Sequence, residues 1–226
     1  MTLDLRRPAG WALVAGPIVA LLGYLAANLL APGTGEEVYR YHLWPLFEGI
    51  ALAGDVVVAL GLPVLLTFAG RASRLHLAGY VGIFAALVML NVGEGTTEAF
   101  VKPYLVAHGG LPAQEPAGFA AFEGVALLAL VAGSLCLGIA ILRARVLPWW
   151  IGVAVIVSCV LGALGLPGAW FLLPDGLFFA ALFAIGLIAV RGGARGGGAA
   201  DAVAPEGAPS AVRRGARGDN AADAVV

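Results

Sequence analysis

The sequence predicts an all-α membrane protein, a polytopic bundle of six transmembrane helices with both termini in the cytoplasm. Three observations predict this fold class. The 226-residue chain is 61% hydrophobic and only 12% charged, whereas about a quarter of the residues in a soluble domain are charged. Its apolar residues gather in runs that are long enough to cross a bilayer. Its basic residues fall mainly in every second connection between those runs.

Six apolar runs approach the length of about 20 residues that a helical span requires. They cover residues 9–31, 46–69, 76–100, 118–142, 146–165 and 169–190. Arg6 and Arg7 precede the first run, as they would in a signal peptide. That run is long for the apolar part of a signal peptide, and no clean small-residue cleavage site follows it, so we expect a retained span. A turn with Gly165, Pro167 and Gly168 separates the last two spans.

The charges predict the orientation of the spans. Eleven of the 13 Lys and Arg residues fall in the segments that are cytoplasmic when both termini lie inside. Only Arg40 and Lys102 fall in the outer segments, in agreement with the positive-inside rule. The sequence therefore predicts a multi-pass protein of a bacterial plasma (inner) membrane, with the lipid bilayer as its main partner. The net charge of -1 argues against a nucleic-acid partner.

Residues 192–226 differ in composition from the rest of the chain. They are dominated by Gly, Ala, Pro, Asp and Arg, and they show no hydrophobic periodicity. Such a segment buries too little apolar surface to offset the entropy of ordering it. We expect a disordered cytoplasmic tail after a transmembrane domain that comprises residues 1–191.

Nine of the 14 acidic residues fall in the outer half of the predicted membrane domain or just outside it. Asp55 is the deepest of them, about ten residues into the second span and by helical rise some 13 Å below the outer interface. An ionisable group inside a bilayer costs about 2.5–3.5 kcal/mol, so its presence indicates a function or a specific partner. The level of Asp55 matches that of Asn91 if the third span is continuous.

Four further acidic residues join Asp55 and Asn91 as candidate binding residues: Glu94, Glu98, Glu123 and Asp175. If the third span is one continuous helix, Asn91, Glu94, Glu98 and Lys102 fall within a stripe of about 80°. Gly93 and Gly95 offer an alternative, in which the span ends early and both glutamates are exposed to water. Glu48 and Glu123 also fit as acidic residues near helix N-termini. Asp175, between Pro174 and Gly176, also fits as a helix cap.

Several familiar site motifs are missing from the sequence. It holds no phosphate-binding loop, no paired-histidine metal motif and no Gly-x-Ser-x-Gly elbow. The three histidines, His42, His76 and His108, are scattered in predicted loops or at span ends. We therefore predict no cofactor and no metal site.

A short stretch, Arg143, Arg145, Leu147, Pro148, Trp149 and Gly152, resembles an element of many small actinobacterial membrane proteins of unknown function. In those proteins a similar run enters the fifth helix from the cytoplasm. Ala53, Gly54 and Asp55 also resemble an aspartate-bearing second helix of such families. The resemblance implies an uncharacterised six-helix integral membrane protein over residues 9–190.

The function we expect is a binding or proton-linked role for an outward-facing polar pocket walled by spans two, three, four and six. Its ligand would be small and lipophilic or cationic. Asp55, Glu94 and Glu123 would be the titrating groups, and Asn91 their hydrogen-bond partner. One alternative is a membrane-embedded enzyme, similar to terpene cyclases, in which the same three carboxyls act as general acids on a lipophilic substrate. A structural subunit of a membrane complex is the other alternative.

Overall fold

A computed structural model describes residues 6–68, 73–114, 116–164 and 172–200. All regular structure in this part of the chain is helical, which confirms the predicted all-α class. In chain order the elements are α1 (Arg6–Leu30), α2 (Glu36–Tyr39), α3 (Trp44–Gly61), η1 (Leu62–Phe68), α4 (Arg74–Ala86), η2 (Leu87–Glu94), η3 (Thr97–Val101), α5 (Lys102–Ala107), α6 (Phe119–Ala144), α7 (Trp149–Ala163) and α8 (Leu172–Ala200).

Among the described residues, five helices are long and apolar enough to cross a membrane. They cover Arg6–Leu30, Trp44–Phe68, Arg74–Ala107, Phe119–Ala144 and Leu172–Gly192. α7 is also apolar but has only 15 residues, which gives a length of about 22 Å against a hydrocarbon core of about 30 Å. The predicted turn at Gly165, Pro167 and Gly168 lies outside the described residues. The predicted fifth span, residues 146–165, therefore has no direct support in the observed helix lengths, and the total of six spans stays a prediction.

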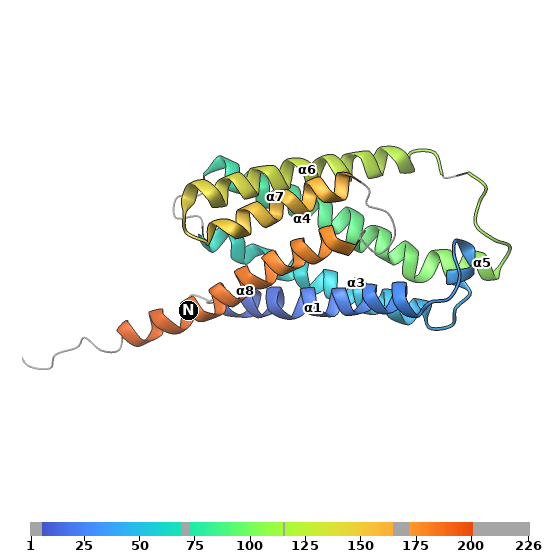
Figure 1. The fold of residues 1–226 in the computed structure, drawn as a ribbon, viewed down its shortest axis with the longest axis horizontal. Helices are drawn as coiled ribbons and strands as arrows, with labels where there is room; N and C mark the ends of the chain where they lie inside the picture. Colours follow the sequence, from blue (N-terminus) through green and yellow to red (C-terminus); the bar gives the residue numbers. More distant parts are fainter. Residues whose placement is uncertain (1–5, 69–72, 115, 165–171, 201–226) are drawn as a thin grey trace, which may run out of the picture.

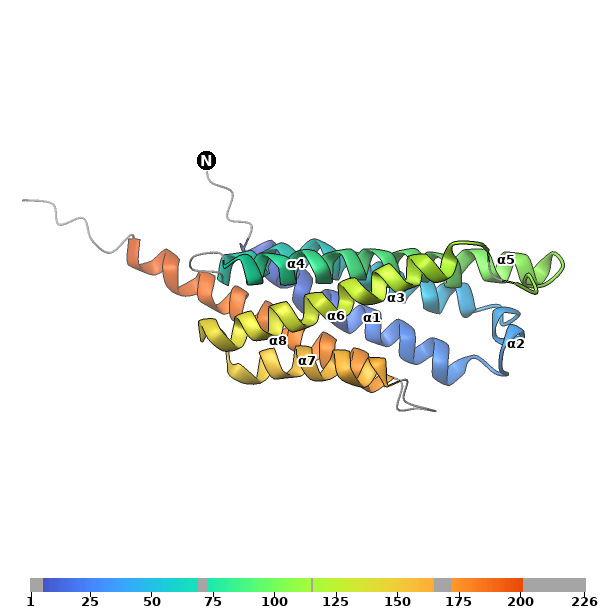
Figure 2. The ribbon, with the colours of Figure 1, turned by 90° about the horizontal axis from the view of Figure 1, so that it is seen from above.

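The long helices form a ring that surrounds the core (Figures 1 and 2). α1 packs against α3 on one side and α8 on the other, α7 packs between α8 and α6, and α6 packs against α4. The continuation of α4 through η2 and η3 contacts α3 and closes the ring. Large apolar side chains that are fully buried, including Leu62, Leu137, Ile151 and Phe179, fill the interior. This arrangement brings α1, α3 and η2, which are far apart in the sequence, next to one another.

The helix that begins at Arg74 continues through Gly93 and Gly95 to Ala107, so the alternative of an early end at these glycines is wrong. Its middle widens into two π-helical segments, η2 and η3. Glycine lacks a side chain, but it retains the backbone N–H that a helix needs, so it does not break the hydrogen-bond ladder. The regular α-helical stripe predicted for Asn91, Glu94 and Glu98 is altered by the wider turns.

The second apolar helix changes character at Leu62, where α3 passes into the 3₁₀ segment η1. Pro63 explains the change, because its ring has no N–H and clashes with the carbonyl of residue i−4. The last helix, α8, continues to Ala200, past the predicted end at residue 190, so the first residues of the predicted tail are helical. The remainder of the predicted disordered tail, residues 201–226, lies outside the described residues.

Candidate functional site

Three polar side chains from three helices meet in the interior of the bundle. The Tyr24 hydroxyl of α1 donates a 2.6 Å hydrogen bond to Oδ2 of Asp55 on α3. Nδ2 of Asn91, on η2, lies 3.3 Å from Oδ1 of the same carboxyl and 3.4 Å from the Tyr24 oxygen. Asp55 is fully buried. The predicted match in depth between Asp55 and Asn91 is confirmed, and Tyr24 is a partner that the sequence analysis missed.

Close packing of α1 against α3 positions the Tyr24–Asp55 pair. Gly23 and Gly54 each precede one member of the pair, and both lie against the backbone of the opposite helix. A Cβ atom built on Gly54 would lie 2.2 Å from the Ala20 nitrogen, and one on Gly23 would lie 2.4 Å from the Ala51 nitrogen. Small residues permit such an approach between membrane helices. The short distance between the backbones allows a phenol on α1 to reach a carboxyl on α3.

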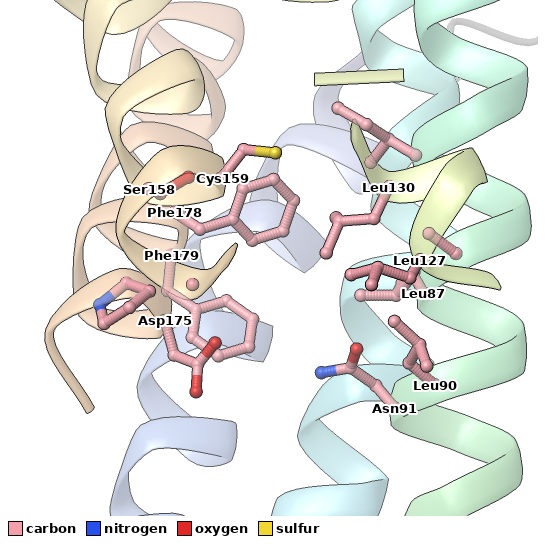
Figure 3. Close-up of a pocket in the computed structure, with 14 residues that line it drawn as sticks. Leu87, Leu90, Asn91, Leu127, Leu130, Ser158, Cys159, Asp175, Phe178 and Phe179 are labelled. Atoms are coloured by element: carbon pink, nitrogen blue, oxygen red, sulfur yellow. The ribbon is translucent and has the colours of Figure 1, made fainter. Parts of the chain in front are cut away.

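A cavity of about 100 Å³ lies beside this group. Its walls come from α4 and η2, α6, α7 and α8, and Asn91 belongs to both the cavity and the Tyr24–Asp55–Asn91 group. Figure 3 shows Asn91 and Asp175 facing the cavity from opposite sides. Asp175 is exposed, so the cavity reaches the molecular surface at this residue. The described residues provide Asp175 with no hydrogen-bond partner and no cation.

The walls of the cavity differ from the predicted ones. α3 contributes no lining residue, and its Asp55 carboxyl is hydrogen-bonded to Tyr24 and Asn91 instead. α7 contributes Ser158, Cys159 and Gly162 instead. The sequence predicts a pocket walled by spans two, three, four and six; this prediction is wrong for span two (α3), and it lacks the predicted fifth span (α7). α7 carries no charged residue that could have indicated its role.

The remaining lining residues are apolar. Phe178 and Phe179 of α8 form one wall (Figure 3). The facing wall consists of leucines from η2 and α6, namely Leu87, Leu90, Leu127 and Leu130. Leu127 is half exposed, so the cavity also approaches the apolar outer surface of the bundle. The site therefore combines one carboxylate and one carboxamide with aromatic and aliphatic walls.

Glu98 belongs to a second group, which we call the outer cluster: Tyr39, Trp44, Glu98 and Lys102. Lys102 forms an ion pair with Glu98 one helical turn away. The Tyr39 hydroxyl donates a 2.9 Å hydrogen bond to Oε2 of Glu98, and the Trp44 indole N–H donates to its backbone oxygen at 3.1 Å. The Lys102 ammonium also lies 5.7 Å from the centre of the Tyr39 ring. These contacts tie α2 and α3 to the end of the long third helix.

The charges of the outer cluster affect the pKa of Tyr39, which lies in the short helix α2 between the long helices α1 and α3. Partial burial of the phenol and the adjacent Glu98 carboxylate raise the pKa of Tyr39 above its ordinary value, while Lys102 opposes the shift. Glu98 is thus a structural ion-pair partner in this conformation. It does not line the cavity.

Glu94 and Glu123, two of the three predicted titrating residues, are half-buried. The Glu94 carboxylate interacts electrostatically with those of Glu98 and Glu123. Neither Glu94 nor Glu123 lines the cavity or hydrogen-bonds to the Tyr24–Asp55–Asn91 group. Across the described residues, no group of three or more His, Cys, Asp or Glu side chains is arranged to hold a metal ion.

Comparison with known proteins gives no match to this chain, whether with protein-family models, curated proteins or solved structures. The resemblance to six-helix actinobacterial membrane proteins rests on the quoted sequence motifs alone and remains a prediction.

Proposed function

We propose that this chain is a six-span membrane protein whose outward-facing cavity binds a small lipophilic cation. The observation that carries the proposal is Asp175, an exposed carboxylate that has no cation partner among the described residues and lies at a cavity walled by Phe178 and Phe179. A carboxylate combined with aromatic faces is the arrangement by which proteins commonly recognise organic ammonium ions. Asn91 places a carboxamide group on the opposite wall.

The distribution of charge along the bundle supports the proposed orientation. The start of α1 and the junction of α6 with α7 lie at one end, while α2 and α5 lie at the other (Figures 1 and 2). The first end carries Arg6, Arg7, Arg143 and Arg145. The positive-inside rule favours a cytoplasmic location for that end. Asp175 lies in the first turn of α8, and in this orientation it faces the outer side.

The size of the cavity limits the ligand. An apolar cavity of about 150 Å³ accommodates benzene, so a site of about 100 Å³ suits a compact ammonium head group. The opening at Asp175 leaves room for a longer tail to extend outward. The leucine wall favours ligands with alkyl groups over small polar ligands.

Ligand binding can be tested with purified protein in nanodiscs, with choline as the cationic probe and 3,3-dimethylbutan-1-ol as its neutral isostere. We expect choline to raise the melting temperature and the neutral alcohol to have a much smaller effect. Asp175→Asn should abolish the difference, and Cys159→Leu should weaken binding by filling the cavity. Glu36→Gln, which removes an exposed outer carboxylate, is the control. Equal shifts with both probes, or an undiminished response in Asp175→Asn, would refute the proposal.

The orientation is tested separately, in intact cells. Cys136 and Cys159 are first replaced by alanine, and single cysteines are placed at position 123, 145 or 175. A membrane-impermeant maleimide added outside should label positions 123 and 175 but not position 145. Labelling of position 145 alone would reverse the orientation, and the proposed outward-facing cavity would then be wrong.

A further inference from the structure

Glu48 of α3 is a buried residue whose carboxyl has no partner among the described residues. It is 6% exposed, and within the described part of the chain it makes neither a hydrogen bond nor an ion pair. An ionised carboxylate withdrawn from water is strongly disfavoured unless donors or a cation compensate it. The surroundings of Glu48 therefore favour a carboxyl that carries a proton.

The position of Glu48 connects two polar groups. It precedes Asp55 by seven residues, which places both carboxyls on one face of α3 about 10 Å apart along the helix axis. Its carboxyl interacts electrostatically with Glu98 of the outer cluster and with Asp55. The Tyr24 phenol, which is hydrogen-bonded to Asp55, also interacts with it. Glu48 thus lies between the outer cluster and the Tyr24–Asp55–Asn91 group.

The titratable groups that face Glu48 come from three elements: Tyr24 on α1, Asp55 on α3 and Glu98 on η3. None of the three is a cation. Lys102 is already paired with Glu98. A proton is the smallest ligand that can neutralise Glu48 in this setting, since the cavity described above does not extend to this residue.

We propose that Glu48 is a proton-binding residue that relays protons between the outer cluster and Asp55. In the inward direction, the O–H bond of the neutral Glu48 carboxyl breaks as its proton passes to the Asp55 carboxylate, which becomes a neutral carboxylic acid. A hydronium ion at the outer cluster then gives a proton to the Glu48 carboxylate and is left as water, which restores the neutral Glu48. A spacing of about 10 Å requires bridging water between the two carboxyls. The relay does not depend on cation binding in the cavity.

Infrared spectroscopy of the reconstituted protein tests the proton-binding step. We expect a carboxylic-acid C=O band at neutral pH that is lost in Glu48→Gln and shifted in frequency in Glu48→Asp. The band should also shift in D₂O, because the relay connects Glu48 to bulk water. Glu37→Gln, which removes an exposed glutamate from α2, is the control and should leave the band unchanged. Identical wild-type and Glu48→Gln spectra, or a band that never shifts in D₂O, would overturn the relay.

The transfer step is measured by time-resolved infrared spectroscopy after an acid pH jump, with the Asp55 signal identified by its loss in Asp55→Asn. A positioned proton donor typically accelerates transfer by about 100-fold or more, so we expect Asp55 to take up its proton at least about tenfold more slowly in Glu48→Gln. Because glutamine matches a protonated glutamate in shape, this variant should fold normally, and its melting temperature provides the check. An unchanged rate at Asp55 would overturn the relay without affecting the cation-binding proposal.

Discussion

The hydroxyl of Tyr24 lies 2.6 Å from Oδ2 of Asp55 and joins α1 to α3 in the interior of the bundle. Asn91 approaches the other carboxyl oxygen, so both oxygens of Asp55 have a donor. A buried acidic group in an apolar helix pair needs such donors, because leaving one unpaired costs its full desolvation energy. The pair is therefore a structural requirement for any function that Asp55 performs.

Tyr24→Phe removes one of these donors while it preserves the ring. We expect a loss of about 1.5–3 kcal/mol in the free energy of unfolding, the range for hydrogen bonds to charged groups. Denaturation in mixed detergent micelles with increasing dodecyl sulfate measures the change. Tyr104→Phe is the matched control, since Tyr104 is 61% exposed. Equal stability of the two variants would mean that the Tyr24–Asp55 bond contributes nothing.

Helical geometry alone could predict part of the site. The rise per residue placed Asp55 level with Asn91, and their side chains do meet. Tyr24 was missed because an uncharged phenol in an apolar run carries no cost that marks it as unusual. The change to π-helix at Leu87 has no comparable sequence signal, so the directions of Glu94 and Glu98 could not be derived from a regular stripe. α7 was missed as a cavity wall because its polar contributors are a serine and a cysteine.

Packing between α1 and α3 gives a second prediction. Gly54→Ala places a methyl group within 2.2 Å of the Ala20 nitrogen, and backbone atoms cannot move aside as a flexible side chain can. We expect a loss of about 1–3 kcal/mol from overpacking, together with displacement of Tyr24 from Asp55. Thermal unfolding in detergent measures the loss. In contrast, Gly124→Ala meets no atom within 4 Å and should be neutral or stabilising, since alanine favours helix. Similar losses in both variants would contradict the close-packing argument.

Ionisation of Tyr39 supplies a prediction about alkaline pH. The raised pKa of this phenol means that it should ionise above the value of about 10 that is typical of an unfolded chain. The contribution of the neutral phenol to the free energy of unfolding is complete below the pKa that Tyr39 has in the unfolded chain. This contribution is lost as the pH rises through the pKa that Tyr39 has in the folded protein. The difference between ultraviolet titrations of wild type and Tyr39→Phe isolates the transition. A Tyr39 transition at or below the ordinary tyrosine pKa would refute the assignment.

The neighbours of Tyr39 should shift the same transition in opposite directions. Glu98→Gln removes the carboxylate that disfavours a phenolate and should lower the pKa of Tyr39, although partial burial keeps part of the shift. Lys102→Gln removes the ammonium that favours the phenolate, so the pKa should rise further. The ultraviolet titration used for Tyr39 measures both changes. Because Lys102 and Glu98 are partly exposed, the lysine variant should cost no more than about 1 kcal/mol of stability. Shifts of the same sign would show that the Tyr39 phenol does not respond to this ion pair.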